Sequence, residues 1–196
     1  MSEAIALELK SPFEASLKDA GAGDGVQVSE RRNLQMATVI ARAGNSDIAA
    51  RLKSAFGLAL LPGPKRSAAN DLAFVATGPR SWLALSEASG LTPKLREALG
   101  EAAAISDQSS GYAVLRLTGP KVRATLEKGI GVDLHPRAFQ PGDAASTSCA
   151  HLGVIIWQID AAPIYEIAVF RSLADSFAHW LQESAAEFGL RVVPPR

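Results

Sequence analysis

The chain resembles itself at an offset of 74 residues. Residues 57–62, Gly-Leu-Ala-Leu-Leu-Pro, align with residues 131–136, Gly-Val-Asp-Leu-His-Pro. Across residues 37–62 and 111–136, six of 26 positions are identical. Two copies are too few for a solenoid, so the repeat predicts two related supersecondary units that share one core.

Composition narrows the possible partners. The 196 residues are 47% apolar and 20% charged, which is ordinary for a globular protein of one domain or two small ones. The 20 basic and 20 acidic residues cancel, so we expect neither nucleic acid nor a membrane surface as a partner. A net charge near zero also disfavours a highly soluble monomer. This is a weak indication that the chain functions as part of a complex.

Targeting and redox signals point to the cytoplasm. The N-terminus lacks the basic patch and apolar run of a signal peptide, and no stretch of 18 apolar residues is present. Cys149 is the single cysteine, so a disulfide framework and a thiolate metal cluster are both excluded. We expect Cys149 to be a buried residue rather than a nucleophile.

The apolar pattern predicts strand, helix, strand, strand, helix in each copy, an α+β fold of two ferredoxin-like βαββα units packed together. The strands are expected near 34–43, 74–76, 82–85, 112–117, 152–159 and 164–170, and the helices at 45–56, 92–100, 121–130 and 172–188. This reading divides the chain into an N-terminal arm with one short strand (1–33), a first half (34–104), a second half (105–190) and a tail (191–196).

Helix boundaries follow from capping residues. Asn45 or Ser46 is expected to cap the first helix, and Gly57 to end it in a left-handed conformation. Gly131 is the corresponding stop in the second copy, and Ser172 the expected cap of the last helix, with Asp175 completing an approximate capping box. Irregular stretches, 63–71 and 137–150, separate helix from hairpin in the two copies and are candidate binding loops.

No set of residues predicts a catalytic or metal site. His135, His151 and His179 lack metal-ligand spacing, and His135 aligns with Leu61, which favours packing. The glycines of 21–25 have neither the preceding strand nor the following helix that a phosphate loop needs, and 63–67 lacks the P-loop order, so a flexible turn and a solvated basic loop are expected.

Neither a nucleophile motif nor a pair of carboxylates predicts catalysis. Gly-x-Ser-x-Gly is absent from the sequence. Asp107 and Asp133 are candidates for inward-facing carboxylates, although neither has a partner that the sequence reveals. The segment 107–111 reads most simply as a polar turn whose side chains bond to their own backbone.

Five residues remain as candidate contacts to a ligand or partner. Trp82, Trp157 and Trp180 are able to stack on a pterin or a base, although aromatic residues inside strand and helix patterns are more often core residues. Asp107 precedes a strand as a possible ligand contact. Arg171 stands between an apolar strand and a helix, where its guanidinium group can bind a carboxylate or phosphate of a ligand. The alternative is that Arg171 forms an ion pair within the chain or with a partner subunit.

The second copy resembles a known family. The likeness rests on Asp107–Ser109, Leu115–Pro120, Val132–Pro136, Phe139, Thr147, Ala150–Leu152, Trp157 and Arg171–Ser176. These segments are similar to the gamma subunit of heterotetrameric bacterial sarcosine oxidase, closely over 105–190 and loosely before. More distantly, Leu117–Pro120 followed by a helix resembles the folate-binding fold of the aminomethyltransferase of the glycine cleavage system.

The resemblance implies a role in sarcosine catabolism and one-carbon metabolism. The expected complex converts sarcosine, oxygen and tetrahydrofolate to glycine, hydrogen peroxide and 5,10-methylenetetrahydrofolate. Its FAD, FMN, NAD and zinc are expected in other subunits, and the partners of this chain are then the large (alpha), beta and delta subunits. The resemblance implies that the chain itself is an accessory subunit with no cofactor and no catalytic residue, which fits a sequence that lacks a nucleotide fingerprint, a metal cluster and a flavin-attachment motif. No aminomethyltransferase catalytic aspartate has a counterpart here, so independent folate chemistry is not expected.

Two other classes stay open. A stand-alone folate or one-carbon binding module would use Asp107, Trp157 and Arg171 around a pterin-glutamate pocket. An autonomous enzyme has the least support, because no candidate acid, base or nucleophile has a visible companion in the sequence.

Overall fold

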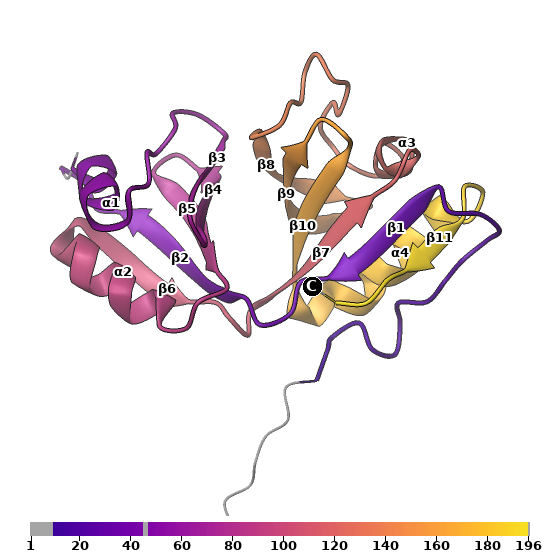
Figure 1. Cartoon of the computed structure of the whole chain (residues 1–196), viewed down its shortest axis with the longest axis horizontal. Helices are drawn as coiled ribbons and strands as arrows, with labels where there is room; N and C mark the ends of the chain where they lie inside the picture. Colours follow the sequence, from indigo (N-terminus) through magenta and orange to yellow (C-terminus); the bar gives the residue numbers. More distant parts are fainter. Residues whose placement is uncertain (1–9, 45–46, 196) are drawn as a thin grey trace, which may run out of the picture.

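The computed structural model describes residues 10–44 and 47–195, which form two β-sheets with helices on their outer faces (Figure 1). The first sheet has five strands in the order β3-β4-β5-β2-β6. Its elements are β2 (Gln35–Ala41), α1 (Ile48–Phe56), β3 (Arg66–Ala69), β4 (Leu72–Gly78), β5 (Ser81–Ser86), α2 (Leu91–Leu99), a 3₁₀ turn η1 (Gly100–Ala102) and β6 (Ala103–Asp107).

The second sheet has six strands in the order β11-β1-β7-β10-β9-β8. Its elements are β1 (Val26–Glu30), β7 (Tyr112–Thr118), α3 (Val122–Leu126), β8 (Ala144–Cys149), β9 (Leu152–Asp160), β10 (Ile164–Phe170), a 3₁₀ turn η2 (Arg171–Leu173), α4 (Ala174–Ala185) and β11 (Leu190–Val192). None of the described helices is long and apolar enough to span a bilayer.

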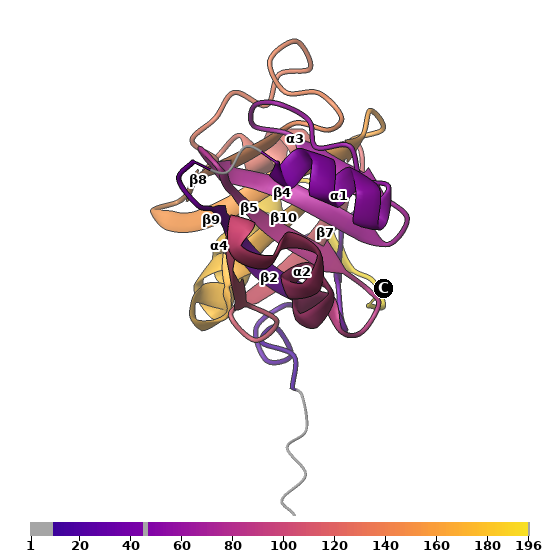
Figure 2. The ribbon, with the colours of Figure 1, turned by 90° about the vertical axis from the view of Figure 1, so that its left-hand side faces the viewer.

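The elements stack as helices, sheet, sheet, helices. Viewed from the first half, α1 and α2 lie in front of the first sheet (Figure 2), and α3 and α4 lie on the far side of the second (Figure 1). One apolar cluster fills the space under each helical layer, and a third, which includes Met36, Val75, Leu83 and Trp157, lies between the sheets. The two halves therefore share one buried interface, but each also has an apolar cluster of its own, so the expectation of a single shared core is wrong.

The α+β class and the pairing of two related units are confirmed, but each unit has more strands than expected. Both halves have the order β-α-β-β-β-α-β. Four strands are additional: β6 and β11 follow the second helix of each half, and β3 and β8 lie in the stretches expected to be irregular, 63–71 and 137–150, so that expectation is wrong for the strand residues. β3 and β8 are edge strands, each held by one antiparallel neighbour, β4 or β9.

Strands also cross the expected segment boundaries. β1, in the arm, pairs antiparallel with β7 and parallel with β11, and so belongs to the second sheet. Its Val26 and Val28 are fully buried, as alternation in a strand with one covered face requires. β6 continues to Asp107, past the boundary placed after 104, and β11 continues to Val192, past the boundary placed after 190.

Of the four capping predictions, one is confirmed, two are wrong and one falls outside the described residues. Gly57 does end α1 as predicted: its φ is 68°, and the N–H groups of Gly57 and Leu58 donate to Lys53 O and Leu52 O. Asn45 and Ser46 lie outside the described residues, and α1 begins after Asp47, whose side chain makes no capping bond. Ser172 is not a cap, because η2 already occupies 171–173 and α4 begins at 174.

The helix expected at 121–130 is shorter than predicted. α3 ends at Leu126, and the chain continues in tight turns with the N–H of Gly129 donating to Leu126 O. Ile130 then forms an antiparallel β-bridge with Cys149, the last residue of β8. The chain therefore already lies beside β8 before Gly131. The strand contact therefore ends the helix, and Gly131 is not its left-handed stop.

Candidate functional site

The edges of the two sheets are joined where β3 meets β8. The Arg66 N–H donates to Gly142 O at 2.7 Å, and the Ala144 N–H donates to Pro64 O at 2.9 Å. The Lys65 ammonium forms an ion pair with Asp143 across the same junction. Two loops far apart in the sequence are therefore held side by side at one end of the molecule.

An apolar groove of about 1110 Å³ opens at this junction. Both copies of the repeated hexamer contribute to it, through Leu60–Pro62 in the first and Val132 and Asp133 in the second. The loops that follow the hexamers and the turn between β4 and β5 complete the wall, which includes Gly63–Lys65, Ala76–Arg80, Trp82, Ala138, Phe139 and Asp143–Ser146. The repeat thus builds both sides of one surface feature.

Exposed apolar surface makes this groove a candidate binding site. Leu61 is 48% exposed, and Trp82 is half-buried, with part of its surface packed on the core under α1 and α2. The charged residues of the wall are two basic ones, Lys65 and Arg80, and two acidic ones, Asp133 and Asp143. A groove with balanced charge and an apolar lining suits an apolar segment of a partner better than a highly charged ligand.

A buried charge cluster lies between the two sheets, away from the groove. Glu166 on β10 is directly opposite Arg116 on β7 and Trp157 on β9. Arg116 donates to Glu166 Oε1 from Nε (2.9 Å) and Nη2 (2.6 Å), and Trp157 Nε1 donates to Oε2 (2.9 Å). Arg31, in the connection between the sheets, adds a further ion pair to Glu166. The Glu166 side chain is only 5% exposed.

The sequence reading missed Glu166, although a signal existed. A carboxylate in the middle of the apolar run Ile164–Phe170 has to find buried partners if that run is a central strand. Trp157, which was a candidate for stacking on a ligand, is fully buried and has its indole N–H engaged by Glu166.

The other candidate residues are scattered. Asp107 is exposed, accepts a bond from the Ser109 N–H (2.9 Å) as the turn reading predicted, and accepts another from Thr92 Oγ1 (2.9 Å). These bonds, the backbone one first, lower the pKa of Asp107 against the opposing effect of partial burial. Arg171 donates to the backbone oxygen of Lys10. Arg171 lines one cavity and Trp157 lines an adjoining one that shares Arg31 with it, and Asp107 lines neither of these two.

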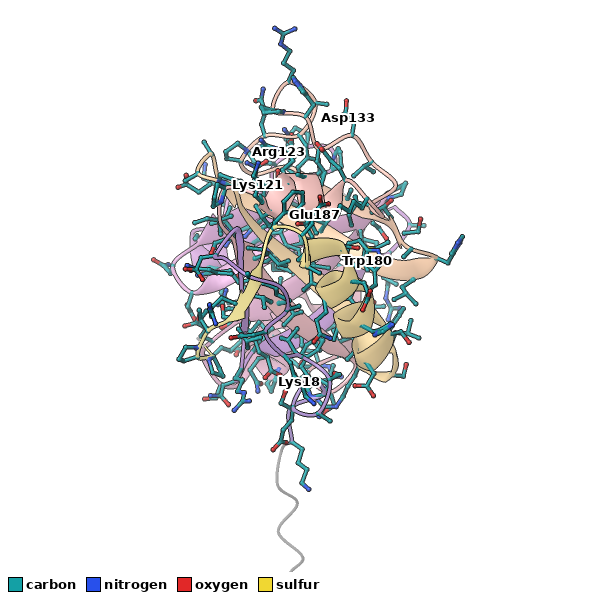
Figure 3. All side chains as sticks on the ribbon, turned by 90° about the vertical axis from the view of Figure 1, so that its right-hand side faces the viewer. Lys18, Lys121, Arg123, Asp133, Trp180 and Glu187 are labelled. Atoms are coloured by element: carbon teal, nitrogen blue, oxygen red, sulfur yellow. The ribbon has the colours of Figure 1, made fainter. Side chains whose placement is uncertain are left out.

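Trp180 is half-buried on α4, on the outer side of the second half (Figure 3). Its ring lies 5.6 Å from that of Phe177, centroid to centroid. A Cβ added to Gly129 would lie 2.6 Å from Trp180 Cζ2, so the glycine is what allows the ring to lie against the turn after α3. Trp180 is thus partly an internal packing residue.

The remaining sequence candidates have structural roles. Asp133 is exposed rather than inward-facing and accepts a bond from the His135 N–H (2.8 Å). His135 is itself exposed, which corrects the expectation that it packs, and the described residues contain no cluster of metal-ligating side chains. Cys149 is buried as expected, and burial raises the pKa of its thiol to about 12.

The two glycine-containing loops are neither flexible nor simply solvated. A Cβ on Gly21 would lie 1.9 Å from Ala186 O, and one on Gly25 would lie 2.5 Å from Phe188 O. The glycines of 21–25 therefore permit close packing against the end of α4. In the loop at 63–67, Lys65 is paired with Asp143, and Arg66 belongs to β3.

Comparisons with known proteins agree on one family. The family model described as the sarcosine oxidase gamma subunit family matches residues 41–187. A sarcosine oxidase subunit gamma from Arthrobacter sp is 36% identical over 149 residues, 74% of this chain and 71% of that protein. The corresponding subunit from Corynebacterium sp. (strain P-1) is 30% identical over 185 residues, 91% of each chain.

Solved structures give the same picture of the fold. A chain of the heterotetrameric sarcosine oxidase from Corynebacterium sp. U-96, in complex with pyrrole 2-carboxylate, matches with a TM-score of 0.77 at 29% identity, over 86% of this chain and 88% of that chain. The glycine cleavage system aminomethyltransferase T from Bartonella henselae matches with a TM-score of 0.63 at 14% identity, over 87% of this chain and 48% of that chain. The second likeness concerns the fold alone.

Proposed function

The chain belongs to the sarcosine oxidase gamma subunit family, and from that premise we propose that it is an accessory subunit that binds its partners without holding a cofactor. The single observation that carries the proposal is the family match across residues 41–187, which includes both walls of the apolar groove. Its finer parts are that the partners are the large (alpha), beta and delta subunits, and that the complex works in the cytoplasm.

The groove is the proposed docking surface for one of these subunits. Stable interfaces bury at least about 1,000 Å² in total and concentrate their energy in a few side chains, most often tryptophan, tyrosine and arginine. Trp82, which is partly packed on the core, supplies such an anchor, and Leu61, which is 48% exposed, adds apolar surface in the same groove. We infer that an apolar segment of a partner subunit inserts between the two hexamer copies.

The reaction is assigned to the complex rather than to this chain. In this proposal the complex converts sarcosine, oxygen and tetrahydrofolate to glycine, hydrogen peroxide and 5,10-methylenetetrahydrofolate, with FAD, FMN, NAD and zinc in other subunits. Two observations support a chain that does not itself catalyse the reaction. The glycines of 21–25 pack against the end of α4 rather than forming a loop around a phosphate. Burial raises the pKa of the Cys149 thiol, which opposes its use as a nucleophile.

Co-expression with the three partner subunits tests both the role and the surface. Leu61→Arg should reduce the amount of chain recovered with the tagged large subunit by about 5–30-fold, the effect of losing 1–2 kcal/mol at an anchor. Ile40→Arg is the matched control, because Ile40 is also exposed (49%) and does not line the groove. Equal recovery of both variants would reject the groove while leaving the subunit role intact.

Failure of the wild-type chain to associate with any partner would reject the role itself. The alternative of a stand-alone folate module predicts instead that the chain by itself binds tetrahydrofolate in a calorimetric titration. That alternative is not favoured by the engagement of Asp107, Trp157 and Arg171 within the chain, by Ser109, Glu166 and the backbone of Lys10 respectively.

A further inference from the structure

A second cavity, of about 430 Å³, lies between the two sheets and is bordered by the charge cluster. Its wall contains three arginines, Arg31, Arg66 and Arg116, together with the buried Glu166. These side chains come from both halves of the chain and from the connection between them. Its volume falls within the range of small-molecule sites, about 300–1,000 Å³.

Both carboxylate oxygens of Glu166 accept hydrogen bonds from its neighbours. Oε1 accepts from Arg31 and Arg116, and Oε2 accepts from the Trp157 indole. Arg31 has one further ion pair, with Glu87 at the rim, where the Glu87 side chain is 68% exposed. Two of the three arginines are therefore paired with Glu166.

Arg66 is the third arginine. Within the described part of the chain its guanidinium makes no hydrogen bond or ion pair, and its Nε is buried without a partner. Its backbone is held in place by pairing with Val75 on β4 and by the bond to Gly142 O. Burial lowers the pKa of the guanidinium, and the field of Glu166 partly opposes this, yet arginine stays charged in proteins.

The cavity wall carries equal numbers of basic and acidic groups: the guanidinium groups of Arg31, Arg66 and Arg116 and the carboxylates of Asp71, Glu87 and Glu166. Glu166 and Glu87 are paired with Arg31 and Arg116. In the part of the chain that the structure describes, the exposed Asp71 accepts a hydrogen bond from the Ser86 hydroxyl at 2.8 Å and forms no ion pair with Arg66. A buried or half-buried cation is costly unless it is paired, so Arg66 is the group in this wall that an incoming negative charge would stabilise.

We propose that this cavity is a binding site for a small monoanionic organic carboxylate, with the Arg66 guanidinium as its principal contact. The planar fork of arginine matches a carboxylate in geometry. Leu34, Leu72 and Leu85 in the wall provide apolar surface for a short hydrocarbon part. A dianion such as phosphate is disfavoured, because its second charge would lie near the Glu166 carboxylate without a second free cation.

Thermal unfolding of the full chain, with sodium acetate as the probe and sodium chloride at equal ionic strength as the reference, tests the proposal. At a concentration about five times its Kd, acetate that binds only the folded chain should raise the Tm by about 2–4 °C. Arg66→Met should abolish this shift, and Arg66→Lys should reduce it, since lysine keeps the charge and loses the fork. Arg42→Met is the matched control, because the Arg42 side chain is 57% exposed and does not line the cavity.

Each outcome bears on the proposal. Loss of the acetate shift in Arg66→Met, with the shift kept in Arg42→Met, supports it. The proposal is overturned if acetate gives no shift beyond chloride, or if Arg66→Met keeps the full shift, which would be a general salt effect. A larger Arg66-dependent shift with inorganic phosphate would overturn the monoanion class.

A second measurement covers the case in which Arg66→Met does not fold. A crystal of the wild-type chain soaked in acetate should show the ion against the Arg66 guanidinium. An empty cavity at an acetate concentration that saturates the Tm shift would refute the site. The inference stands apart from subunit binding, because the cavity lies between the sheets and the docking groove lies at their joined edge.

Discussion

Replacing Glu166 by alanine is the sharpest test of how the two halves are held together. The change removes the one carboxylate that is shared by Arg31, Arg116 and the Trp157 indole. It leaves two largely buried guanidinium groups, with side chains 11% and 22% exposed, facing each other and a third, Arg66. It also leaves a buried indole N–H without an acceptor.

The expected cost is large because the partners cannot reach water. At an effective dielectric constant near 20, two charges 2.6 Å apart attract by about 6 kcal/mol, of which desolvation of the ions offsets a large share. Removing one partner of a buried pair typically costs about 3–5 kcal/mol, and an unsatisfied N–H about 1–3 kcal/mol, with overlap between the two. We therefore expect the free energy of unfolding to fall by about 4 kcal/mol.

Equilibrium urea unfolding measures the change. With an m-value of about 2 kcal/mol/M, the midpoint should fall by about 2 M. Glu101→Ala is the matched control, because the Glu101 side chain is 96% exposed and lies 3.8 Å from Arg42; its midpoint should be unchanged. Glu166→Gln, which keeps an acceptor for the indole and loses the charge, should fall between the wild type and Glu166→Ala.

A double-mutant cycle separates pairing from cavity formation. The cycle of Glu166→Ala with Arg116→Ala should give a coupling energy of about 0.5–3 kcal/mol, since the two residues are in direct contact. A Glu166→Ala variant within 1 kcal/mol of the wild type would refute the reasoning, because it would mean that the cluster is hydrated and its charges are independent.

Two further outcomes follow from packing and burial. Gly129→Ala should lower the free energy of unfolding by about 1–3 kcal/mol, because the added Cβ would lie 2.6 Å from Trp180 Cζ2. Gly153→Ala is the control and should be nearly neutral, because no atom lies within 4 Å of the added Cβ. Equal effects of the two variants in urea unfolding would contradict this. Cys149, with its thiol pKa raised to about 12 by burial, should resist iodoacetamide at pH 8 in the folded chain and react once the chain unfolds. Because the ordinary thiol pKa is 9.0, the stability contributed by its protonated form is complete below pH 9 and is lost as the pH rises toward 12, and Cys149→Ala should remove this dependence; rapid labelling of the folded chain would show that the thiol is accessible.

Several features of the fold were predictable because they depend on local chemistry. Gly57 ends α1 because a left-handed residue is needed there. Alternation and continuous apolar runs located β7, β9 and β10, since a strand covered on both faces has no polar positions to spare. The internal repeat predicted two related halves, and the hexamer copies proved to line a single groove.

The missed strands have no such local signal. β3 (Arg-Ser-Ala-Ala) and β8 (Ala-Ala-Ser-Thr-Ser-Cys) are short and largely polar or small. They are strands because β4 and β9 present unpaired backbone groups beside them, and because the two edges then bond to each other. In the same way α3 stops at Leu126 because Ile130 is drawn into a bridge with Cys149.

The candidate contact residues also differ in how far the sequence predicts their surroundings. Trp82 does line the groove, and the polar-turn reading of Asp107 is confirmed by its bond to Ser109. Arg171 and Trp180 are occupied by contacts within the chain that the sequence could not reveal. As contacts to a partner or ligand, all of these residues remain predictions, and the partner pull-down bears only on the groove that Trp82 lines.

By itself the sequence determined the α+β class, the doubled architecture, the family and the absence of a thiolate cluster, because these depend on periodicity, composition and residue identity. Only the tertiary structure decided which charges meet. Arg31, Arg66, Arg116 and Glu166 are separated by up to 135 positions along the chain, and they share a cavity because strand pairing and sheet stacking place them there. Long-range contacts of this kind are set by the register between strands, and a one-residue shift would have turned Glu166 to the opposite face.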